Sequence, residues 1–345
     1  MSYPHRSPDG FRSLPLVDVE PLLAPGATHL EPTVAALRRA ASEVGFLYVT
    51  GHAVPAARIT ALEQAARELF ALPVAQKLEY HIARSRHHRG YVPPGEEVFY
   101  GQSEDTKEAF DLGLELPEAD YGRASRLLGP NVWPRQVAGF RAAISAYYAD
   151  VFALGRALLG GFALALGLPR AYFEPFLQAP PSQLRLIHYA PAPARVGAMG
   201  IGAHTDYECL TILHATAPGL EVMNGAGEWL AAPPVPGAFV VNIGDLLEVW
   251  SNGVFVSTSH RVSPVPVRRY SFPLFFNVDY PTRVEPLPHL CQRGARYAPL
   301  VAGDHLLAQT IQTFRYLIEL RQRGEIELPD GARAPASFGR DRGER

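Results

Sequence analysis

The second half of this chain contains short apolar segments at a spacing that is typical of antiparallel β-structure. Pro, Gly or Asn separates the segments, which are residues 184–189, 210–214, 238–243, 254–256 and 272–278. Many short strands at regular intervals favour a two-sheet sandwich or barrel, such as a jelly roll. Asn252-Gly253 is a strong signal for a two-residue hairpin, so we expect the strand after it to pair antiparallel with residues 246–250.

The remaining parts of the chain have the periodicity of helices. Apolar residues recur every three or four positions in four segments, which are residues 33–44, 56–70, 134–166 and 304–323. Residues 46–50 form a short apolar strand directly after the first of these helices. The pair Gly160-Gly161 predicts a break in the long third helix. We therefore expect a mixed α and β protein with a jelly-roll core and flanking helices, which are mainly N-terminal.

This pattern divides the chain into five consecutive regions. We expect an N-terminal helical and mixed region (1–130), long supporting helices (131–180), the jelly-roll core (181–285), a C-terminal helical segment (286–328) and a tail (329–345). The tail is rich in Arg, Asp, Gly and Pro, a composition that predicts mobility.

The composition excludes several classes of protein. Hydrophobic residues make up 47% of the 345 residues and the net charge is −2, so nothing favours binding to nucleic acid or to an anionic membrane. Arg156 and the glycine pair interrupt the most apolar stretch, 151–168, which favours a buried helix over a membrane span. The first thirty residues lack the apolar run of a signal peptide, and two cysteines form no disulfide framework. We therefore expect a cytoplasmic protein.

A histidine and an aspartate, His204 and Asp206, precede the apolar segment at 210–214. On an extended strand, side chains two residues apart point to the same face. An imidazole and a carboxylate on one face supply two of the three ligands of a 2-His-1-carboxylate site for non-haem Fe(II). The same spacing occurs at His29-Leu30-Glu31 without any strand signal, so the motif needs a third ligand elsewhere in the chain.

Five other histidines are candidates for that ligand. His188 and His214 lie in predicted strands near the pair, whereas His289 and His305 follow the β region. His260 is the strongest candidate, because it lies in the strand that follows the predicted hairpin, within the same β region. Taken alone, His260 also fits a half-buried strand histidine that is bonded to a hydroxyl group.

An arginine and a serine follow His260 at the start of the next apolar strand. Arg269 and Ser271 are two residues apart, so their side chains share a face of that strand. A planar guanidinium beside a hydroxyl group is suited to hold a carboxylate through bidentate hydrogen bonds. The order His-x-Asp, His, Arg-x-Ser within one β region favours a single combined site.

These motifs together resemble the isopenicillin N synthase-like branch of the Fe(II)/2-oxoglutarate-dependent dioxygenases. The resemblance extends from about residue 14 to about residue 320, and its core motifs are Gly202-Ala-His-Thr-Asp206, Asn242-Ile-Gly-Asp245, Ser259-His-Arg-Val262 and Arg269-Tyr-Ser271. The family's fold is a double-stranded β-helix of jelly-roll type flanked by helices, which agrees with the fold expected from the segments.

The resemblance implies a role for each motif residue. His204, Asp206 and His260 would be ligands of Fe(II), and Arg269 and Ser271 would hold the distal carboxylate of 2-oxoglutarate. Tyr189 matches a strand tyrosine that often assists there, although a core aromatic is an equal interpretation. The implied reaction couples O2 and the decarboxylation of 2-oxoglutarate to hydroxylation, desaturation or cyclisation of a small-molecule substrate. We expect a monomer or a weak homo-oligomer.

Two alternatives remain open at this point. An isopenicillin N synthase-like oxidase would use Fe(II) and O2 without 2-oxoglutarate, and a non-catalytic jelly-roll protein would bind only a metal or a ligand. For substrate contacts we expect the loops 89–101 and 274–280 to border the site, with six candidate residues, which are Arg89, Tyr91, Glu96, Glu97, Tyr100 and Phe276. Each of the six also fits a surface or packing role.

Overall fold

The computed structural model describes residues 10–24, 26, 29–98, 107–123, 125–191, 200–264 and 266–332. Its strands are β1 (Leu16–Asp18), β2 (Phe46–Thr50), β3 (Gly90–Val92), β4 (Glu108–Gly113), β5 (Gln183–Tyr189), β6 (Ile201–His204), β7 (Leu210–Ala215), β8 (Leu220–Met223), β9 (Trp229–Ala231), β10 (Phe239–Ile243), β11 (His260–Val262), β12 (Arg269–Phe276), β13 (Arg283–Val284) and β14 (Leu300–Val301). Its α-helices are α1 (Glu20–Leu23), α2 (Glu31–Glu43), α3 (Ala56–Ala71), α4 (Val74–Leu78), α5 (Phe140–Ala165), α6 (Asp245–Trp250), α7 (Ala302–Thr313) and α8 (Arg315–Gln322).

Two antiparallel sheets form the core that the sequence predicted. The larger sheet has eight strands in the order β1-β2-β10-β7-β12-β5-β4-β3, and the smaller has the order β6-β11-β8-β9. Every strand pair in both sheets is antiparallel except β1 with β2. The mixed α and β class and the jelly-roll core with flanking helices are therefore confirmed, and strands from the N-terminal half extend the larger sheet at both edges.

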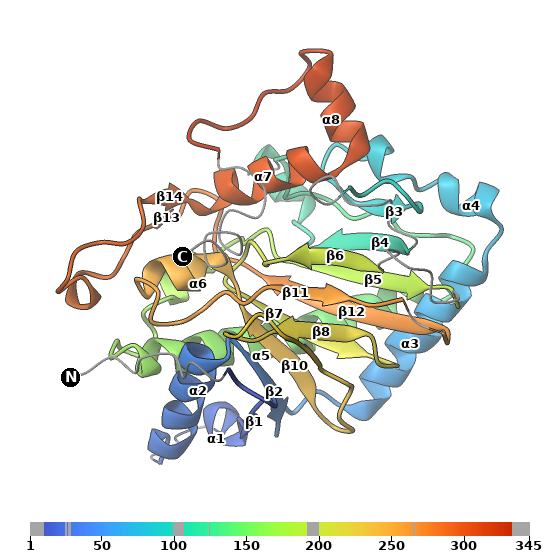
Figure 1. The fold of residues 1–345 in the computed structure, drawn as a ribbon. Coiled ribbons are helices and arrows are strands. Elements are labelled where there is room, and N and C mark those ends of the chain that lie inside the picture. Colours follow the sequence, from blue (N-terminus) through green and yellow to red (C-terminus); the bar gives the residue numbers. More distant parts are fainter. Residues whose placement is uncertain are drawn as a thin grey trace.

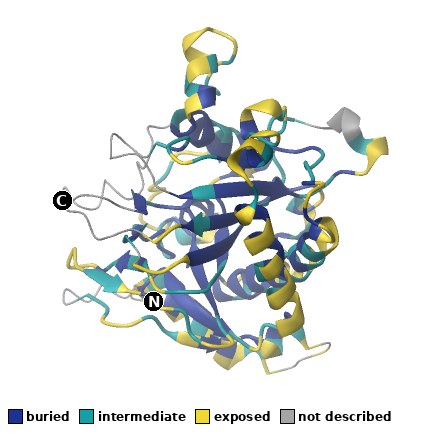
Figure 2. Cartoon of the chain, turned by 90° about the vertical axis from the view of Figure 1, so that its right-hand side faces the viewer, coloured by how far each residue is buried: buried dark blue, intermediate teal, exposed yellow. Residues whose placement is uncertain are grey.

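Helices α2, α3 and α5 cover one face of the larger sheet. Helix α5 packs against α2 and α3 and also contacts β7 and β12; in Figure 1 it runs behind the strands. Figure 2 shows that the strands are mostly buried, whereas exposed residues lie on helices and connections at the periphery. This arrangement leaves the other face of the larger sheet free to pack against the smaller sheet.

The predicted break at Gly160-Gly161 is wrong. Helix α5 continues through both glycines. A Cβ atom at Gly161 would lie 2.8 Å from the side chains of both Leu22 and Leu37. The glycine therefore allows α1 and α2 to approach α5 closely, and burial of the helix outweighs the low helix propensity of glycine. The helix also begins later than expected, at Phe140 instead of residue 134.

The predicted hairpin at Asn252-Gly253 is also wrong. Residues 246–250 lie within helix α6, and residues 254–256 form no strand. Both turn residues have positive φ, as the sequence suggested, but here they end a helix: the Gly253 N–H donates to Glu248 O at 2.9 Å. The Asn252 amide nitrogen donates to Leu290 O and Gly294 O, both at 3.0 Å. Left-handed residues suit a helix end as well as a hairpin.

The C-terminal helix expected over 304–323 is divided into α7 and α8. Phe314, in extended conformation, separates them and forms an isolated bridge with Glu97. Figure 1 shows α7 and α8 beyond the edge of the sheets where β3, β4 and β6 lie. Of the tail expected to be mobile, only residues 329–332 belong to the described part of the chain.

Among the described residues, α5 is the helix long and apolar enough to cross a membrane. Half of its most apolar window is buried inside the structure, and the core helix of a globular protein meets the same criteria. Its contacts with α2, α3 and β12 give it the position of a core helix.

Candidate active site

Three predicted ligands converge between the two sheets. His204 is the last residue of β6, and His260 is the first residue of β11 and lies directly opposite it in the antiparallel pair. Asp206 follows β6 instead of lying within it, which corrects the single-strand placement expected from the sequence. Potential ligand atoms of the three side chains all lie within 4.8 Å of one another. The sheet pairing thus brings together His204 and His260, which are 56 positions apart in the sequence.

Both imidazole rings are oriented to present Nε2 to the aspartate. His204 Nδ1 lies 2.8 Å from Gly202 O, and His260 Nδ1 lies 3.3 Å from Thr258 O. A carbonyl oxygen can only accept, so Nδ1 carries the proton and Nε2 carries the lone pair. The Nε2 atoms lie 3.7 Å and 3.5 Å from Asp206 Oδ1. These donor atoms fit a 2-His-1-carboxylate metal site.

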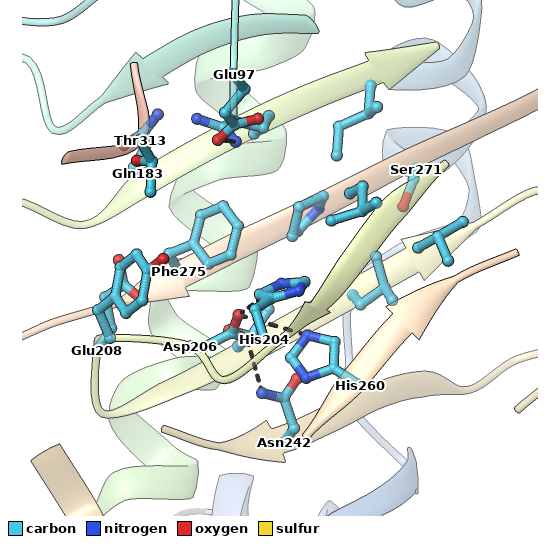
Figure 3. A pocket seen from close by; sticks show the side chains of 18 of the residues that line it. Glu97, Gln183, His204, Asp206, Glu208, Asn242, His260, Ser271, Phe275 and Thr313 are labelled. Atoms are coloured by element: carbon cyan, nitrogen blue, oxygen red, sulfur yellow. Dashed lines mark hydrogen bonds and ion pairs between the residues drawn. The ribbon is translucent and has the colours of Figure 1, made fainter. Parts of the chain in front are cut away.

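The Asp206 carboxylate is held by two neighbouring side chains. Thr211 Oγ1 and Asn242 Nδ2 both donate to Asp206 Oδ2, the latter at 2.7 Å. These bonds occupy one oxygen and leave Oδ1 directed toward the two histidines, as Figure 3 shows. Partners of this kind fix the orientation of a metal ligand. Thr211 comes from β7 and Asn242 from β10, which both belong to the larger sheet. The larger sheet therefore positions Asp206, whereas the two histidines come from strands of the smaller sheet.

The electrostatics of the triad favour the protonation states that bind a metal. Burial, followed by the charge of His260, lowers the pKa of His204 to about 4. Burial raises the pKa of Asp206, but the charges of His260 and His204 and its two hydrogen bonds outweigh that effect and lower it. At neutral pH, His204 is therefore neutral and Asp206 is ionised, the forms in which these groups ligate metals.

We expect Asn242→Ala to weaken Fe(II) binding by about 10- to 100-fold, because Asp206 would lose a hydrogen bond that orients it. The measurement is an anaerobic Fe(II) titration of the purified variant. Asn224→Ala is the matched control, because Asn224 is similarly buried but bonds to Phe11 O and within the turn at residues 224–228, not to the triad. Equal losses of metal affinity in the two variants would contradict the positioning role of Asn242.

Arg269 and Ser271 lie on one face of β12, as predicted, and both line the same pocket as the triad. Arg269 is 1% exposed; its Nε donates to Ala217 O at 3.0 Å, while Nη1 has no hydrogen-bond partner among the described residues. Tyr189 pairs with Arg269 across β5 and β12, and its ring lies 4.8 Å from the guanidinium carbon. A buried guanidinium with an unpaired N–H and a neighbouring hydroxyl fits a carboxylate ligand.

The triad and this pair line the same cavity, whose volume is about 910 Å³ including the space at its mouth that is open to solvent. Strands of both sheets line it, together with Leu306, Thr310, Thr313 and Phe314 near the end of α7. Figure 3 shows Ser271 to the right of the triad, Gln183, Glu208 and Thr313 to its left, and Glu97 above it, nearer to Gln183 than to Ser271. The cavity therefore has one side with Arg269 and Ser271 and a second side with different polar groups.

The other candidate histidines have structural partners and lie outside this triad. His188 Nδ1 lies 2.8 Å from Glu108, and His214 Nε2 lies 2.9 Å from Glu63. His289 Nε2 lies 2.9 Å from Leu166 O, and His305 Nε2 lies 3.3 Å from Asp245. Each residue therefore stabilises local packing.

Of the six predicted substrate contacts, Glu97 lines the cavity. Arg89 is buried and donates to carbonyl oxygens of 87, 88 and 127, while Tyr91 donates to Glu108 at 2.6 Å. Glu96 accepts from the backbone N–H of Tyr316, and Phe276 packs where a Cβ at Gly155 would lie. These four have packing roles, the interpretation that the sequence favoured over substrate contact for each of them, and Tyr100 lies outside the described residues.

Sequence reasoning missed two polar residues of the cavity, Gln183 and Glu208. The Gln183 amide nitrogen is buried and has no hydrogen-bond partner among the described residues. Glu208 is 5% exposed, and burial, followed by the charge of Asp206, raises its pKa to about 8. Glu208 follows Asp206 by two residues in the sequence. This proximity was the one sequence feature that could have placed Glu208 near the triad.

A buried charge cluster supports the second side of the cavity. Arg185 forms two hydrogen bonds with Asp111, at 2.7 Å and 2.8 Å, and one with Glu97 at 2.7 Å. Lys107 also pairs with Glu97. Burial raises the pKa of Glu97, but Arg185 and Lys107 outweigh this effect and lower it. Burial raises the pKa of Asp111 against the opposing effect of Arg185, and the two carboxyl groups and two cations of the cluster compensate one another.

Arg185→Met should lower the free energy of unfolding by about 3–5 kcal/mol, because it would leave two buried carboxylates without their main partner. Urea unfolding followed by circular dichroism measures the change. Arg283→Met is the control, since Arg283 forms an exposed pair with Glu285 that contributes little. A loss below about 1 kcal/mol for Arg185→Met, the value typical of a surface pair, would contradict this account.

Comparisons with known proteins agree with this site. A family model described as the 2OG-Fe(II) oxygenase superfamily matches residues 180–278, and one described as the N-terminal part of non-haem dioxygenases in morphine synthesis matches residues 14–136. A homoarginine-6-hydroxylase of Oryza sativa is 34% identical over 324 residues, which cover 88% of this chain and 98% of that protein.

Solved structures of similar fold also belong to 2-oxoglutarate- and Fe(II)-dependent oxygenases. A 2OG-Fe(II) oxygenase family protein from Caulobacter crescentus has a TM-score of 0.75 at 31% identity, covering 92% of this chain and 100% of its own. A full-length Neurospora crassa protein in complex with α-ketoglutarate (2-oxoglutarate) has a TM-score of 0.74 at 27% identity. The match covers 85% of this chain and 95% of that protein. These relatives favour the use of 2-oxoglutarate over the oxidase and non-catalytic alternatives. The chain belongs to the 2-oxoglutarate- and Fe(II)-dependent oxygenase superfamily and is a dioxygenase that uses Fe(II), 2-oxoglutarate and O2.

Proposed function

We propose that His204, Asp206 and His260 hold the Fe(II) ion and that Arg269 and Ser271 bind the distal carboxylate of 2-oxoglutarate. The observation that carries this proposal is the convergence of the three ligand groups within 4.8 Å in the cavity that Arg269 and Ser271 also line. Tyr189, whose ring lies against Arg269, would complete the carboxylate subsite. Fe(II) bound there supplies coordination positions at which 2-oxoglutarate and O2 react.

The side chains around the triad would then orient the reactants and exclude water. Ser271 and Arg269 set the depth at which 2-oxoglutarate enters, and Asn242 and Thr211 hold the Asp206 carboxylate. Apolar residues from both sheets, among them Phe46, Leu213 and Val262, line the cavity and keep water from the reacting groups. The substrate would lie on the second side of the cavity, where Glu97, Gln183 and Glu208 are found.

We further propose hydroxylation as the outcome with the primary substrate. In that reaction one atom of O2 enters succinate and the other enters the new hydroxyl group, while a C–H bond breaks and CO2 leaves. O2 accepts four electrons, two from 2-oxoglutarate and two from the substrate, so the reaction needs no other reductant. Relatives named as homoarginine-6-hydroxylases support this outcome and make homoarginine the first substrate to test.

The test is a screen of small metabolites, including homoarginine, for substrate-dependent release of succinate by the Fe(II)-loaded protein. Each turnover should give one succinate per hydroxylated product, and no product should form without 2-oxoglutarate. Product formation in buffer that lacks 2-oxoglutarate would refute the proposed co-substrate role. A desaturated or cyclised product with the same stoichiometry would refute hydroxylation alone.

We also propose that the protein is cytoplasmic and acts as a monomer or a weak homo-oligomer, without nucleic-acid or membrane partners. Both cysteines, Cys209 and Cys291, are free, which is compatible with a reducing compartment. The net charge of −2 supports the absence of a nucleic-acid partner.

A further inference from the structure

Glu208 is a buried carboxylate that forms no ion pair with any described side chain. Two backbone N–H groups, those of residues 207 and 208, lie near enough to act on it. The neighbouring charges that affect it most are Asp206 and Asp245, which are both negative. A buried acidic group without a cation is costly to ionise, so its carboxylate form is favoured when a ligand places a positive group beside it.

The other charges of the cavity are already compensated. Arg185 and Lys107 offset Glu97 and Asp111 through direct pairs. In the loaded site, the two charges of Fe(II) and the charge of Arg269 would offset Asp206 and the two carboxylates of 2-oxoglutarate. Burial and the charges of Arg185 and Arg89 lower the pKa of His88, which keeps that ring neutral. Among the described acidic residues that line the cavity, Glu208 is therefore the one without a cationic counterpart.

The backbone at Glu208 is held rigidly. The Leu246 N–H donates to Glu208 O at 3.1 Å, and the Asp245 N–H donates to Asp206 O at 2.9 Å. Any Cβ at position 244 would lie 2.2 Å from Glu208 O, so Gly244 is what permits this close approach. The start of α6 thus fixes the backbone of Glu208 relative to that of Asp206, which limits the positions that the Glu208 side chain can take beside the triad.

Glu208 is also placed to contact the substrate and not 2-oxoglutarate. In Figure 3 it lies on the opposite side of the triad from Ser271 and below Gln183 and Thr313. Gln183 adds an amide nitrogen that has no partner among the described residues, a donor suited to an acceptor group on the same ligand. Glu208 and Gln183 together thus offer an acceptor for a cation and a donor for a second group on this side of the cavity.

We propose that the Glu208 carboxylate binds a guanidinium or ammonium group of the primary substrate, so that the enzyme acts on a small cationic metabolite. This inference rests on the proposed function, since the same cavity must hold Fe(II) and 2-oxoglutarate. Glu208 is a specificity-determining residue in this account: it holds the cationic end and thereby selects which carbon of the substrate faces the metal.

The experiment compares cations with neutral molecules of the same shape. Anaerobic protein loaded with Fe(II) and 2-oxoglutarate is titrated with L-arginine and L-citrulline, L-homoarginine and L-homocitrulline, and L-lysine and L-2-aminoheptanoic acid. Binding is read from the change in the Fe(II)–2-oxoglutarate charge-transfer absorption. In at least one pair, the cationic member should bind about 30-fold or more tightly than its neutral partner, the effect expected when a buried charge pair loses one member.

Glu208→Gln keeps the size of the side chain and removes its charge. This variant should bind the preferred cation about 30-fold or more weakly and should bind cation and neutral partner within about threefold of each other. Glu285→Gln, a change of the same kind at an exposed residue, should keep the wild-type preference. A retained cation preference in Glu208→Gln would overturn the proposal.

The titrations of the wild-type protein alone also test whether the substrate is a cation. Equal binding of a neutral partner, or failure of every cationic probe to bind, would overturn the proposal while the charge-transfer absorption stays intact. Absence of that absorption before any probe is added would instead refute the proposed metal and 2-oxoglutarate site. Failure of the further inference and failure of the proposed function therefore give different results.

Discussion

His260→Ala should abolish both Fe(II) binding and turnover. His260 supplies one of three ligand atoms that lie within 4.8 Å of one another. Among the described residues that line the pocket, the other imidazoles are His204, which is itself a ligand, and His88. His88 Nδ1 is held 2.7 Å from Tyr316 Oη, away from the triad. Two remaining ligands leave Fe(II) weakly held, so we expect no iron after desalting and succinate release at background.

The control is His29→Ala, which removes the histidine of the second His-x-acid motif in the chain. His29 is exposed and lies outside the pocket, so this variant should retain iron and wild-type turnover. Iron content is measured by metal analysis after anaerobic loading, and turnover by succinate release. If both variants lost activity to the same extent, the ligand assignment would be wrong.

Arg269→Ala should raise the Michaelis constant for 2-oxoglutarate by about 10- to 150-fold, the loss expected for a hydrogen bond to a charged group. The guanidinium is buried, its Nη1 has no partner among the described residues, and it lies on the same strand face as Ser271. Iron affinity should change little, because the described hydrogen bonds of Arg269 involve none of the triad side chains. Steady-state kinetics and an anaerobic iron titration give the two quantities.

Arg269→Lys separates charge from geometry. A lysine keeps the positive charge but loses the planar fork, so it should recover part of the 2-oxoglutarate affinity. Arg283→Ala, at an exposed position, should change neither quantity. An unchanged Michaelis constant in Arg269→Ala would place 2-oxoglutarate elsewhere in the molecule.

Several strands of the larger sheet were predictable because each is short, apolar and bounded by turn residues, whereas β8 and β9 of the smaller sheet were not predicted. Residues 46–50, 184–189 and 210–214 form β2, β5 and β7 within one residue of the expected bounds. The spacing of Arg269 and Ser271 also predicted their common face, because alternation along a strand is a local property.

The errors occurred where tertiary contacts decide the local structure. Asn252-Gly253 has the left-handed conformation that the sequence indicates, but contacts with Leu290 and Gly294 place it at the end of α6. Gly161 lies in an unbroken helix because α1 and α2 pack against it. A single sequence does not contain the position of a neighbouring helix, so neither result followed from the local pattern.

The triad was predictable from motif order, whereas the substrate side was not. His204, Asp206 and His260 carry chemistry that few residue types supply, so their combination stands out. Glu208 and Gln183 are ordinary polar residues whose importance depends on burial and on the absence of a described partner. Those properties come from strands and helices distant in sequence, and only the folded structure reveals them.

The most direct test of this account is an anaerobic titration of the wild-type protein with Fe(II) and 2-oxoglutarate, followed by absorption spectroscopy. A metal held by His204, Asp206 and His260, with Arg269 anchoring the co-substrate, predicts a charge-transfer band. The band should saturate at one equivalent each of Fe(II) and 2-oxoglutarate per chain. Absence of the band, or a band that persists unchanged in His260→Ala, would contradict the proposed site.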